Sequence, residues 1–301
     1  MKIATTIGEM YAHTGSYTEA IAAYKDTGFR YLDFSFYTMV LKENDPIMSD
    51  SWKDTILECK ETAQNLGLQF VQAHTPAFHW DKDVERGLAG TIRSIEACGM
   101  LGIRNAVIHS ALFPEFKYPE DAEGYFKANE PFFRALIPAM EENNVSILFE
   151  NTTIKHCGDR SYFPILGKDL NAFVEFMDHP LFGAAWDVGH AHMDGIDHYT
   201  EIMEMKDTLK AVHIHDNDGQ WDQHTAPFLG TLDYDSLMRG LIESGYDGYF
   251  TLESDGFFKR NRSQNLSGPL ACTPLEVKKA ALSMLYTISK SILSAYNVYE
   301  E

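Results

Sequence analysis

Four side chains that can bind a cation stand at the ends of four short apolar runs. They are Glu150 after Ser-Ile-Leu-Phe, Asp187 after Phe-Gly-Ala-Ala-Trp, His213 after Lys-Ala-Val, and Glu253 after Tyr-Phe-Thr-Leu. Gaps of 37, 26 and 40 residues separate them. Each gap suits a strand, a helix and two loops, since a βαβ unit takes roughly 30 residues or more. The pattern predicts a barrel of parallel strands with its chemistry at their carboxyl ends.

More side chains of the same kinds follow these and other strand ends. They are His74, His109, His190, His215, Asp222 and His224. A lone histidine or glutamate at a strand end is more often a hydrogen-bonded structural group than a ligand. Burying an isolated carboxylate costs several kcal/mol or more, so converging acidic groups would repel or titrate without a cation among them. The whole constellation therefore favours a metal site.

Two of the histidines lie two residues apart on one predicted strand. Side chains at that spacing face the same side of a strand, so His213 and His215 point the same way. We expect His213 to be at the depth that reaches the metal. His215 would then contact the substrate or a metal ligand, or pack in the core.

Apolar runs typical of buried strands alternate with amphipathic segments along the whole chain. The predicted strands are Lys2–Ile7, Tyr31–Ser35, Gln69–His74, Ala106–His109, Ser146–Glu150, Phe182–Asp187, Lys210–His213 and Gly248–Glu253. The predicted helices are Thr18–Thr27, Trp52–Leu66, Val84–Met100, Asn129–Asn143, Leu170–Met177, Thr200–Thr208, Tyr234–Ser244 and Pro274–Tyr296. Eight such pairs without a linker-like stretch predict an α/β fold, a single (β/α)8 TIM barrel over residues 1–301. A doubly wound sheet is the alternative, but no Gly-x-Gly-x-x-Gly follows any strand.

Two parts of this scheme are less regular. Pro131 stands near the start of its predicted helix, where a missing N–H costs little, while Pro138 inside that helix predicts a kink or a break. The segment 112–119, rich in aromatic residues, is expected to be a loop that closes over a ligand or packs on its neighbours.

Composition narrows the class of protein. The chain has a formal charge of −19, which repels phosphate backbones unless a local basic patch is present. No apolar run approaches the ~18 residues of a membrane span, and the apolar start is too short for a secretory signal. The four cysteines, Cys59, Cys98, Cys157 and Cys272, are widely spaced, which favours free thiols in a cytoplasmic protein.

Several segments together resemble the xylose-isomerase-like superfamily of TIM barrels, in particular its sugar phosphate isomerase/epimerase group. They are Leu148–Asn151, Trp186–His190, Val212–Gly219, Asp222–His224, Leu229–Asp233 and Thr251–Glu253. The resemblance implies that Glu150, Asp187, His213 and Glu253 bind one divalent metal. It also implies that His190 faces the substrate and that Glu150 and Glu253 form an acid/base pair. His74, His109 and His215 are further candidates for substrate binding.

This family likeness leads to a mechanism for a sugar or polyol substrate. Carboxylate and imidazole ligands suit Mn²⁺, Mg²⁺, Co²⁺ or Zn²⁺. The cation would stabilise the enediolate that forms when one glutamate removes the α-proton. The proton returns at the neighbouring carbon in an isomerase, or the opposing glutamate delivers one to the other face in an epimerase. Lys259, Arg260 and Arg262 could bind a substrate phosphate, or could form an exposed basic loop.

Three alternatives remain. An endonuclease IV-like phosphodiesterase would hold up to three Zn²⁺, and His74, His109, His190, Asp222 and His224 would supply the additional metal ligands. The acidic charge argues against nucleic acid as a partner. An inosose dehydratase-type lyase would start with the same enolisation, and a non-catalytic sugar-binding or metal-storage protein would need no acid/base pair. A homo-oligomer is possible, with Ile288, Ile292 and Leu293 serving association or internal packing.

Overall fold

The computed structural model describes residues 1–301 except 81, 156–160, 255 and 257–271. Eight parallel strands form one sheet in the order β10-β1-β2-β3-β4-β6-β8-β9. The strands are β1 (Ile3–Thr6), β2 (Tyr31–Ser35), β3 (Gln69–His74), β4 (Asn105–Ile108), β6 (Ser146–Glu150), β8 (Phe182–Asp187), β9 (Leu209–His213) and β10 (Phe250–Leu252). A parallel bridge between Ile214 and Leu252 joins the two ends of the sheet. The predicted TIM barrel is therefore confirmed.

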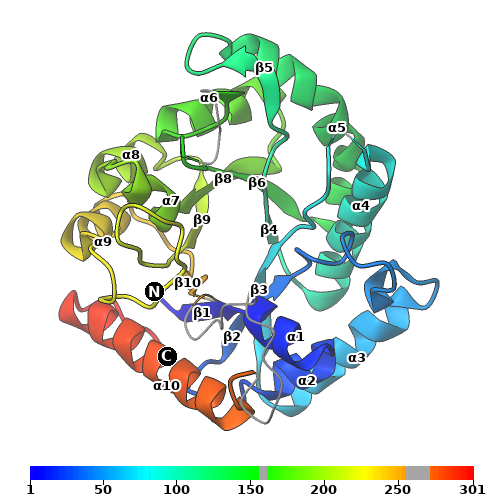
Figure 1. Cartoon of the computed structure of the whole chain (residues 1–301), viewed down its shortest axis with the longest axis vertical. Helices are drawn as coiled ribbons and strands as arrows, with labels where there is room; N and C mark the ends of the chain where they lie inside the picture. The colour runs from blue at the N-terminus through cyan, green and yellow to red at the C-terminus, as the bar shows by residue number, and fades with distance from the viewer. Residues whose placement is uncertain (81, 156–160, 255, 257–271) are drawn as a thin grey trace.

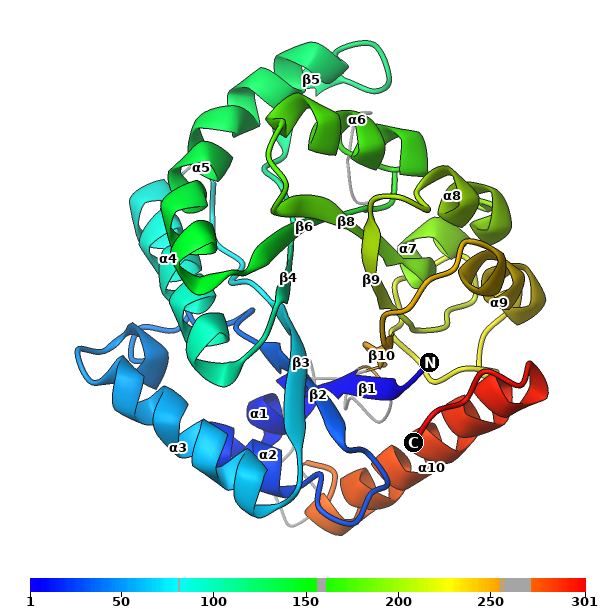
Figure 2. The ribbon, with the colours of Figure 1, turned by 180° about the vertical axis from the view of Figure 1, so that it is seen from behind.

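Helices surround the strands on the outside of the barrel (Figures 1 and 2). They are α2 (Tyr17–Ala22), α3 (Trp52–Asn65), α4 (Val84–Leu101), α5 (Ala122–Asn143), α6 (Gly167–Met177), α8 (His198–Glu204), α9 (Tyr234–Glu243) and α10 (Leu275–Ala295). Within the described part of the chain, no helix combines the length and the apolar character that crossing a membrane requires. Ile292 and Leu293 on α10 are buried in the core, so internal packing accounts for them.

The structure adds short elements that the sequence pattern did not predict. Helix α1 (Gly8–Thr14) follows β1, helix α7 (Val188–Met193) follows β8, and η1 (Pro46–Met48) precedes α3. The expected loop over 112–119 contains a strand, β5 (Phe113–Lys117), which pairs antiparallel with β7 (Ser161–Tyr162). Such a pairing between short segments that are distant in sequence leaves no recognisable pattern in either segment.

Several predicted helices have different bounds in the structure, and α5 and α2 differ from the prediction by five residues or more at one end. Helix α5 begins at Ala122 rather than at Asn129, so Pro131 lies well inside it together with Pro138. The helix continues past both prolines because Phe132, Phe133 and Leu136 on this stretch are anchored in the core. Helix α2 ends five residues before the predicted Thr27, and Ser16 caps its start by accepting the Glu19 N–H at 3.4 Å.

An aromatic cluster fills the layer between the sheet and helices α5 and α6. The Phe149 ring lies 4.8 Å from that of Phe133, 4.2 Å from that of Phe173 and 5.3 Å from that of Phe182. Phe149 immediately precedes Glu150, and successive side chains of a strand face opposite sides. Packing of the Phe149 ring outside the barrel therefore orients Glu150 toward the barrel interior.

We expect Phe149→Ala to lower the free energy of unfolding by about 3–5 kcal/mol, the usual cost of removing a buried aromatic ring. Urea denaturation followed by circular dichroism would measure the change. The matched control is Phe228→Ala, because the Phe228 side chain is 63% exposed. Equal and small effects of the two substitutions would contradict this account of the cluster.

Candidate metal centre

The candidate ligands form a polar layer directly above an apolar layer inside the barrel. The apolar layer is a separate buried cluster of Val107, Leu148, Ala185 and Ala211. His109, Glu150, Asp187 and His213 stand two residues further along the chain, at the ends of the same strands or, for His109, directly after β4. Because side chains two apart on a strand face the same side, these groups also point into the barrel.

The opposite wall is built in the same way. Gln72 on β3 and Thr251 on β10 are buried, and the Thr251 hydroxyl donates to the Gln72 side-chain oxygen at 3.2 Å across the barrel. His74 and Glu253 follow two residues later. The barrel thus brings together all the predicted strand-end ligands at its carboxyl end.

The central group consists of Glu150, Asp187, His213 and Glu253. One ligand atom from each lies within 4.8 Å of those of the other three. His213 Nδ1 donates to Glu150 Oε1, and Glu253 Oε2 lies 3.4 Å from the same nitrogen. The predicted convergence of these four residues is therefore present.

A second group joins the first through Glu150. Its Oε2 atom lies 3.1 Å from His109 Nε2 and 3.5 Å from His74 Nε2. His74 Nδ1 donates to the Thr75 carbonyl at 2.8 Å, which leaves Nε2 facing the carboxylate. Glu150 could accordingly be shared between two metal positions.

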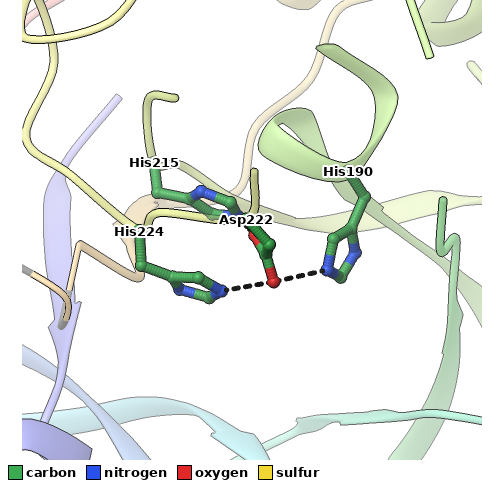
Figure 3. Close-up of side chains that lie close together, drawn as sticks. All are labelled: His190, His215, Asp222 and His224. Atoms are coloured by element: carbon green, nitrogen blue, oxygen red, sulfur yellow. Dashed lines mark hydrogen bonds and ion pairs between the residues drawn. The ribbon is translucent and has the colours of Figure 1, made fainter. Parts of the chain in front are cut away.

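The third group is assembled by Asp222, which lies between two histidines (Figure 3). Its Oδ2 atom is 3.6 Å from His190 Nε2 and 3.3 Å from His224 Nε2. His215 is fully buried, stacks on His224 with ring centroids 3.9 Å apart, and donates from Nε2 to Asp187 Oδ1 at 3.0 Å. His215 is not among the described residues that line the open cavity, so it is placed to orient Asp187 rather than to contact a substrate.

Close backbone packing holds this third group. A Cβ atom added to Gly189 would lie 1.8 Å from His215 Cε1. Glycine is therefore required at position 189 for the imidazole to keep its place against α7.

Electrostatic contacts within the central group oppose the effect of burial on its pKa values. Burial alone would raise the pKa of Glu150, but the facing His213 and His109 imidazoles outweigh it and hold that pKa well below its usual value. Burial alone would lower the pKa of His213, yet Glu253 and Glu150 raise it well above its usual value. Burial raises the pKa of Glu253, although His213 opposes the shift. The charges of these carboxylates and imidazoles thus compensate one another, and a bound cation could compensate the carboxylates in the same way.

The donor atoms fit a metal ion. Glu150 Oε2, although close to the His109 and His74 imidazoles, and Asp222 Oδ1 are buried without a hydrogen bond among the described residues, and such atoms are costly unless another ligand satisfies them. Mixed imidazole and carboxylate donors are compatible with Mn²⁺, Mg²⁺, Co²⁺ or Zn²⁺. Glu150, Asp187 and His213 could hold such an ion together with Glu253.

Two buried residues of the site were missed by the sequence reasoning. Asp33 on β2 has both carboxylate oxygens buried without a hydrogen-bond partner among the described residues, and its Oδ2 atom lies 4.0 Å from His213 Nε2. An acidic residue inside the apolar run Tyr31–Ser35 was the available signal. Asn151 accepts the Asp187 N–H at 2.7 Å and donates to the Asp187 carbonyl at 2.9 Å, so it fixes one metal-ligand candidate.

A cavity of about 860 Å³ opens onto the groups. Its lining includes His74, His109, His190, Asp222, His224 and Glu253. The basic segment with Lys259, Arg260 and Arg262 lies outside the described residues, as does Cys157. Cys59 and Cys98 are buried free thiols, and Cys272 is an exposed one.

Asp216 holds the loop that carries Asp222 and His224. Its Oδ1 atom accepts the Asn217 N–H at 2.9 Å and the Leu232 N–H at 3.1 Å. Its Oδ2 atom accepts the Phe228 N–H at 3.0 Å. Asp216 thereby links both ends of the loop.

We expect Asp216→Ala to lower the free energy of unfolding by about 2–4 kcal/mol, because it leaves buried N–H groups without acceptors. It should also weaken Zn²⁺ binding by the third group, measured by calorimetric titration. Asp207→Ala, which removes an exposed aspartate elsewhere, is the control. Unchanged stability and Zn²⁺ titration in Asp216→Ala would refute this positioning role.

Comparison with solved structures shows the same fold over almost the whole chain. A D-tagatose 3-epimerase-like protein matches with a TM-score of 0.72 and 19% identity, covering 99% of this chain and 98% of the other. D-allulose 3-epimerase from Methylomonas sp. matches with a TM-score of 0.70 and 18% identity, covering 97% and 98%. An AP endonuclease, family 2, from Brucella melitensis matches with a TM-score of 0.63 and 18% identity, covering 84% and 92%.

Curated relatives match over shorter stretches. An uncharacterized protein of Sinorhizobium fredii is 26% identical over 172 residues, 56% of this chain and 52% of the relative. Fructoselysine 3-epimerase of Escherichia coli O157:H7 is 42% identical over 50 residues, 17% of this chain and 18% of the relative. The chain spans about half the length of two of the curated relatives that it matches.

The family model described as "xylose isomerase-like TIM barrel" matches residues 21–267, well over half of the sequence. The chain belongs to the xylose isomerase-like TIM barrel family.

Proposed function

We propose that this protein is a divalent-metal-dependent isomerase or epimerase of a sugar or sugar phosphate. The observation that carries the proposal is the meeting of Glu150, Asp187, His213 and Glu253 within 4.8 Å of one another beside an open cavity. Glu253 lines that cavity, whereas Glu150 is almost completely buried behind the histidines. The arrangement suits one metal with a carboxylate available to a bound substrate.

The similar proteins support this reaction class. Structures that share the fold over nearly the full chain carry the names D-tagatose 3-epimerase-like protein and D-allulose 3-epimerase. The short stretch shared at 42% identity belongs to a fructoselysine 3-epimerase. Each of these names refers to 3-epimerases, and an epimerase inverts the configuration at one carbon.

The chemistry needs a base and an acid on the two faces of the substrate. Glu253 and Glu150 approach the same His213 nitrogen, and we assign them as the acid/base pair, with Glu253 acting from the cavity and Glu150 from the buried side. One glutamate removes the α-proton and the other returns a proton, which inverts the carbon. A bound metal would polarise the neighbouring carbonyl and so make the α-proton more acidic.

His190 is placed to act on the substrate from the side. Its Nδ1 atom donates to the Asn151 carbonyl at 3.0 Å, and the ring lines the cavity. Burial alone would lower its pKa, but Asp187 and Asp222 raise that pKa to about 10. A protonated His190 can donate a hydrogen bond to a substrate oxygen that gains negative charge.

We expect the protein, incubated with Mn²⁺ and ketohexoses in deuterated water, to exchange the hydrogen next to the ketose carbonyl. Proton NMR would follow the loss of that signal and the appearance of the epimer. Glu253→Gln should slow exchange by about 10²–10⁴-fold, the usual contribution of a general base.

The control for that experiment is Glu243→Gln, which changes an exposed glutamate on α9. Metal content measured on each variant separates loss of the base from loss of the ion. Absence of exchange with all ketoses and aldoses tested would count against the proposed function.

A second candidate function is a phosphodiesterase with three metal ions. The observation that favours it is that all three ligand groups exist in the structure and that Glu150 belongs to two of them. We expect about one divalent ion per chain by plasma emission spectrometry on protein purified without chelator. Three zinc ions per chain, with hydrolysis of a phosphodiester and no ketose exchange, would favour the phosphodiesterase.

A further inference from the structure

The cavity above the ligand groups is larger than one sugar ring requires. Its volume of about 860 Å³ is near the upper end of the ~300–1,000 Å³ that is usual for drug-sized ligands. A hexose has only about twelve non-hydrogen atoms, far fewer than such a ligand. Space therefore remains for a second group when a sugar lies at the ligand residues.

One part of this cavity is aromatic, and we call it the outer cavity. Tyr37, Phe78 and Trp80 line it, and the Tyr37 side chain is 42% exposed. The Tyr37 ring lies 5.1 Å from the His74 ring, edge to face. Since His74 borders Glu150, this aromatic surface begins one ring away from the proposed metal centre.

The aromatic surface is held by close packing. The Phe78 and Trp80 rings are 4.4 Å apart, and both contact the Phe132 ring of α5, at 5.5 Å and 4.6 Å. A Cβ atom added to Gly87 of α4 would lie 2.3 Å from the Phe78 ring. The absence of a side chain at position 87 thus allows Phe78 to lie flat on the helix.

A cationic side chain lines the same cavity and has supports of its own. Lys42 is the one lysine or arginine among the described residues that line the cavity. Its ammonium lies 3.7 Å from the centre of the Tyr11 ring, and the Tyr11 hydroxyl donates to the buried Asp45 carboxylate at 2.7 Å. The Lys42 carbonyl also accepts from Arg86 Nη2 at 3.1 Å.

We propose that the outer cavity is a subsite for a second sugar ring, and that the natural substrate is a two-ring sugar conjugate. Sugar rings offer C–H faces to aromatic rings and hydroxyl oxygens to an ammonium group, and the cavity lining supplies both partners. The proposal rests on the proposed function, because it places the reacting sugar at the metal centre. Binding of the remote ring would then contribute to the reaction of the first one.

The test compares fructose with isomaltulose, a fructose that carries glucose on its C6 hydroxyl, far from the reacting carbons. With Mn²⁺ present, we expect kcat/KM for solvent exchange to be at least about tenfold higher for isomaltulose, equivalent to ~1.4 kcal/mol. Calorimetric titration of the Mn²⁺-loaded protein should show tighter binding of isomaltulose than of fructose. This second readout needs no turnover.

Two variants locate the effect. Trp80→Ala removes a ring. Gly87→Ala displaces the Phe78 ring but removes no aromatic residue from the chain. Both should reduce the preference for isomaltulose over fructose, whereas Trp80→Phe should restore much of it. Tyr199→Ala on α8, away from the cavity, is the matched control and should leave the preference unchanged.

The outcomes separate the two proposals. Exchange with equal preference for fructose and isomaltulose, or a preference that Trp80→Ala and Gly87→Ala do not alter, would overturn the subsite and leave the proposed function standing. Tighter binding of isomaltulose that depends on Trp80, without exchange, would support the subsite and refute the isomerase or epimerase. Equal binding without exchange would refute both.

Discussion

The contact between His213 and Glu150 depends on the regular alternation of side chains in the barrel strands. Val107, Leu148, Ala185 and Ala211 fill the interior below the site, and the next inward-facing position on each of their strands carries a ligand group. A shift of one residue in strand register would turn every such group toward the helices. Packing of Phe149 between α6 and the sheet opposes such a shift on β6. The site therefore depends on apolar packing that contains no ligand residue.

Gathering so many ionisable groups in one interior has an electrostatic consequence. Removing one charge from a buried set leaves the others uncompensated, which is more costly than the loss of the contact itself. This effect is largest for Glu150, because its carboxylate faces the imidazoles of His74, His109 and His213 together. It joins the central group to the histidine pair, so the two groups cannot titrate or bind ions independently.

Strand ends and ligand types were visible in the sequence because both follow local rules. Parallel strands present their carboxyl ends on one face, so residues at the ends of Ser146–Glu150 and Phe182–Asp187 had to meet once a barrel was assumed. The roles of histidines after the strands were harder to separate, since His215 lies in a turn whose path depends on Asp216 and Gly189. Asp33 was overlooked because it occurs inside a strand rather than at its end. The β5–β7 pair and the early start of α5 depend on contacts between distant segments, which no local pattern reveals.

The packing of Gly189 against His215 makes these two positions dependent on one another. A larger residue at 189 has room only if the ring at 215 has first been replaced by something smaller. The reverse order is open, because shrinking residue 215 creates space without a clash. Among descendants of this chain, diversity at position 189 should therefore occur only in lineages that have already lost the imidazole, and with it the hydrogen bond to Asp187.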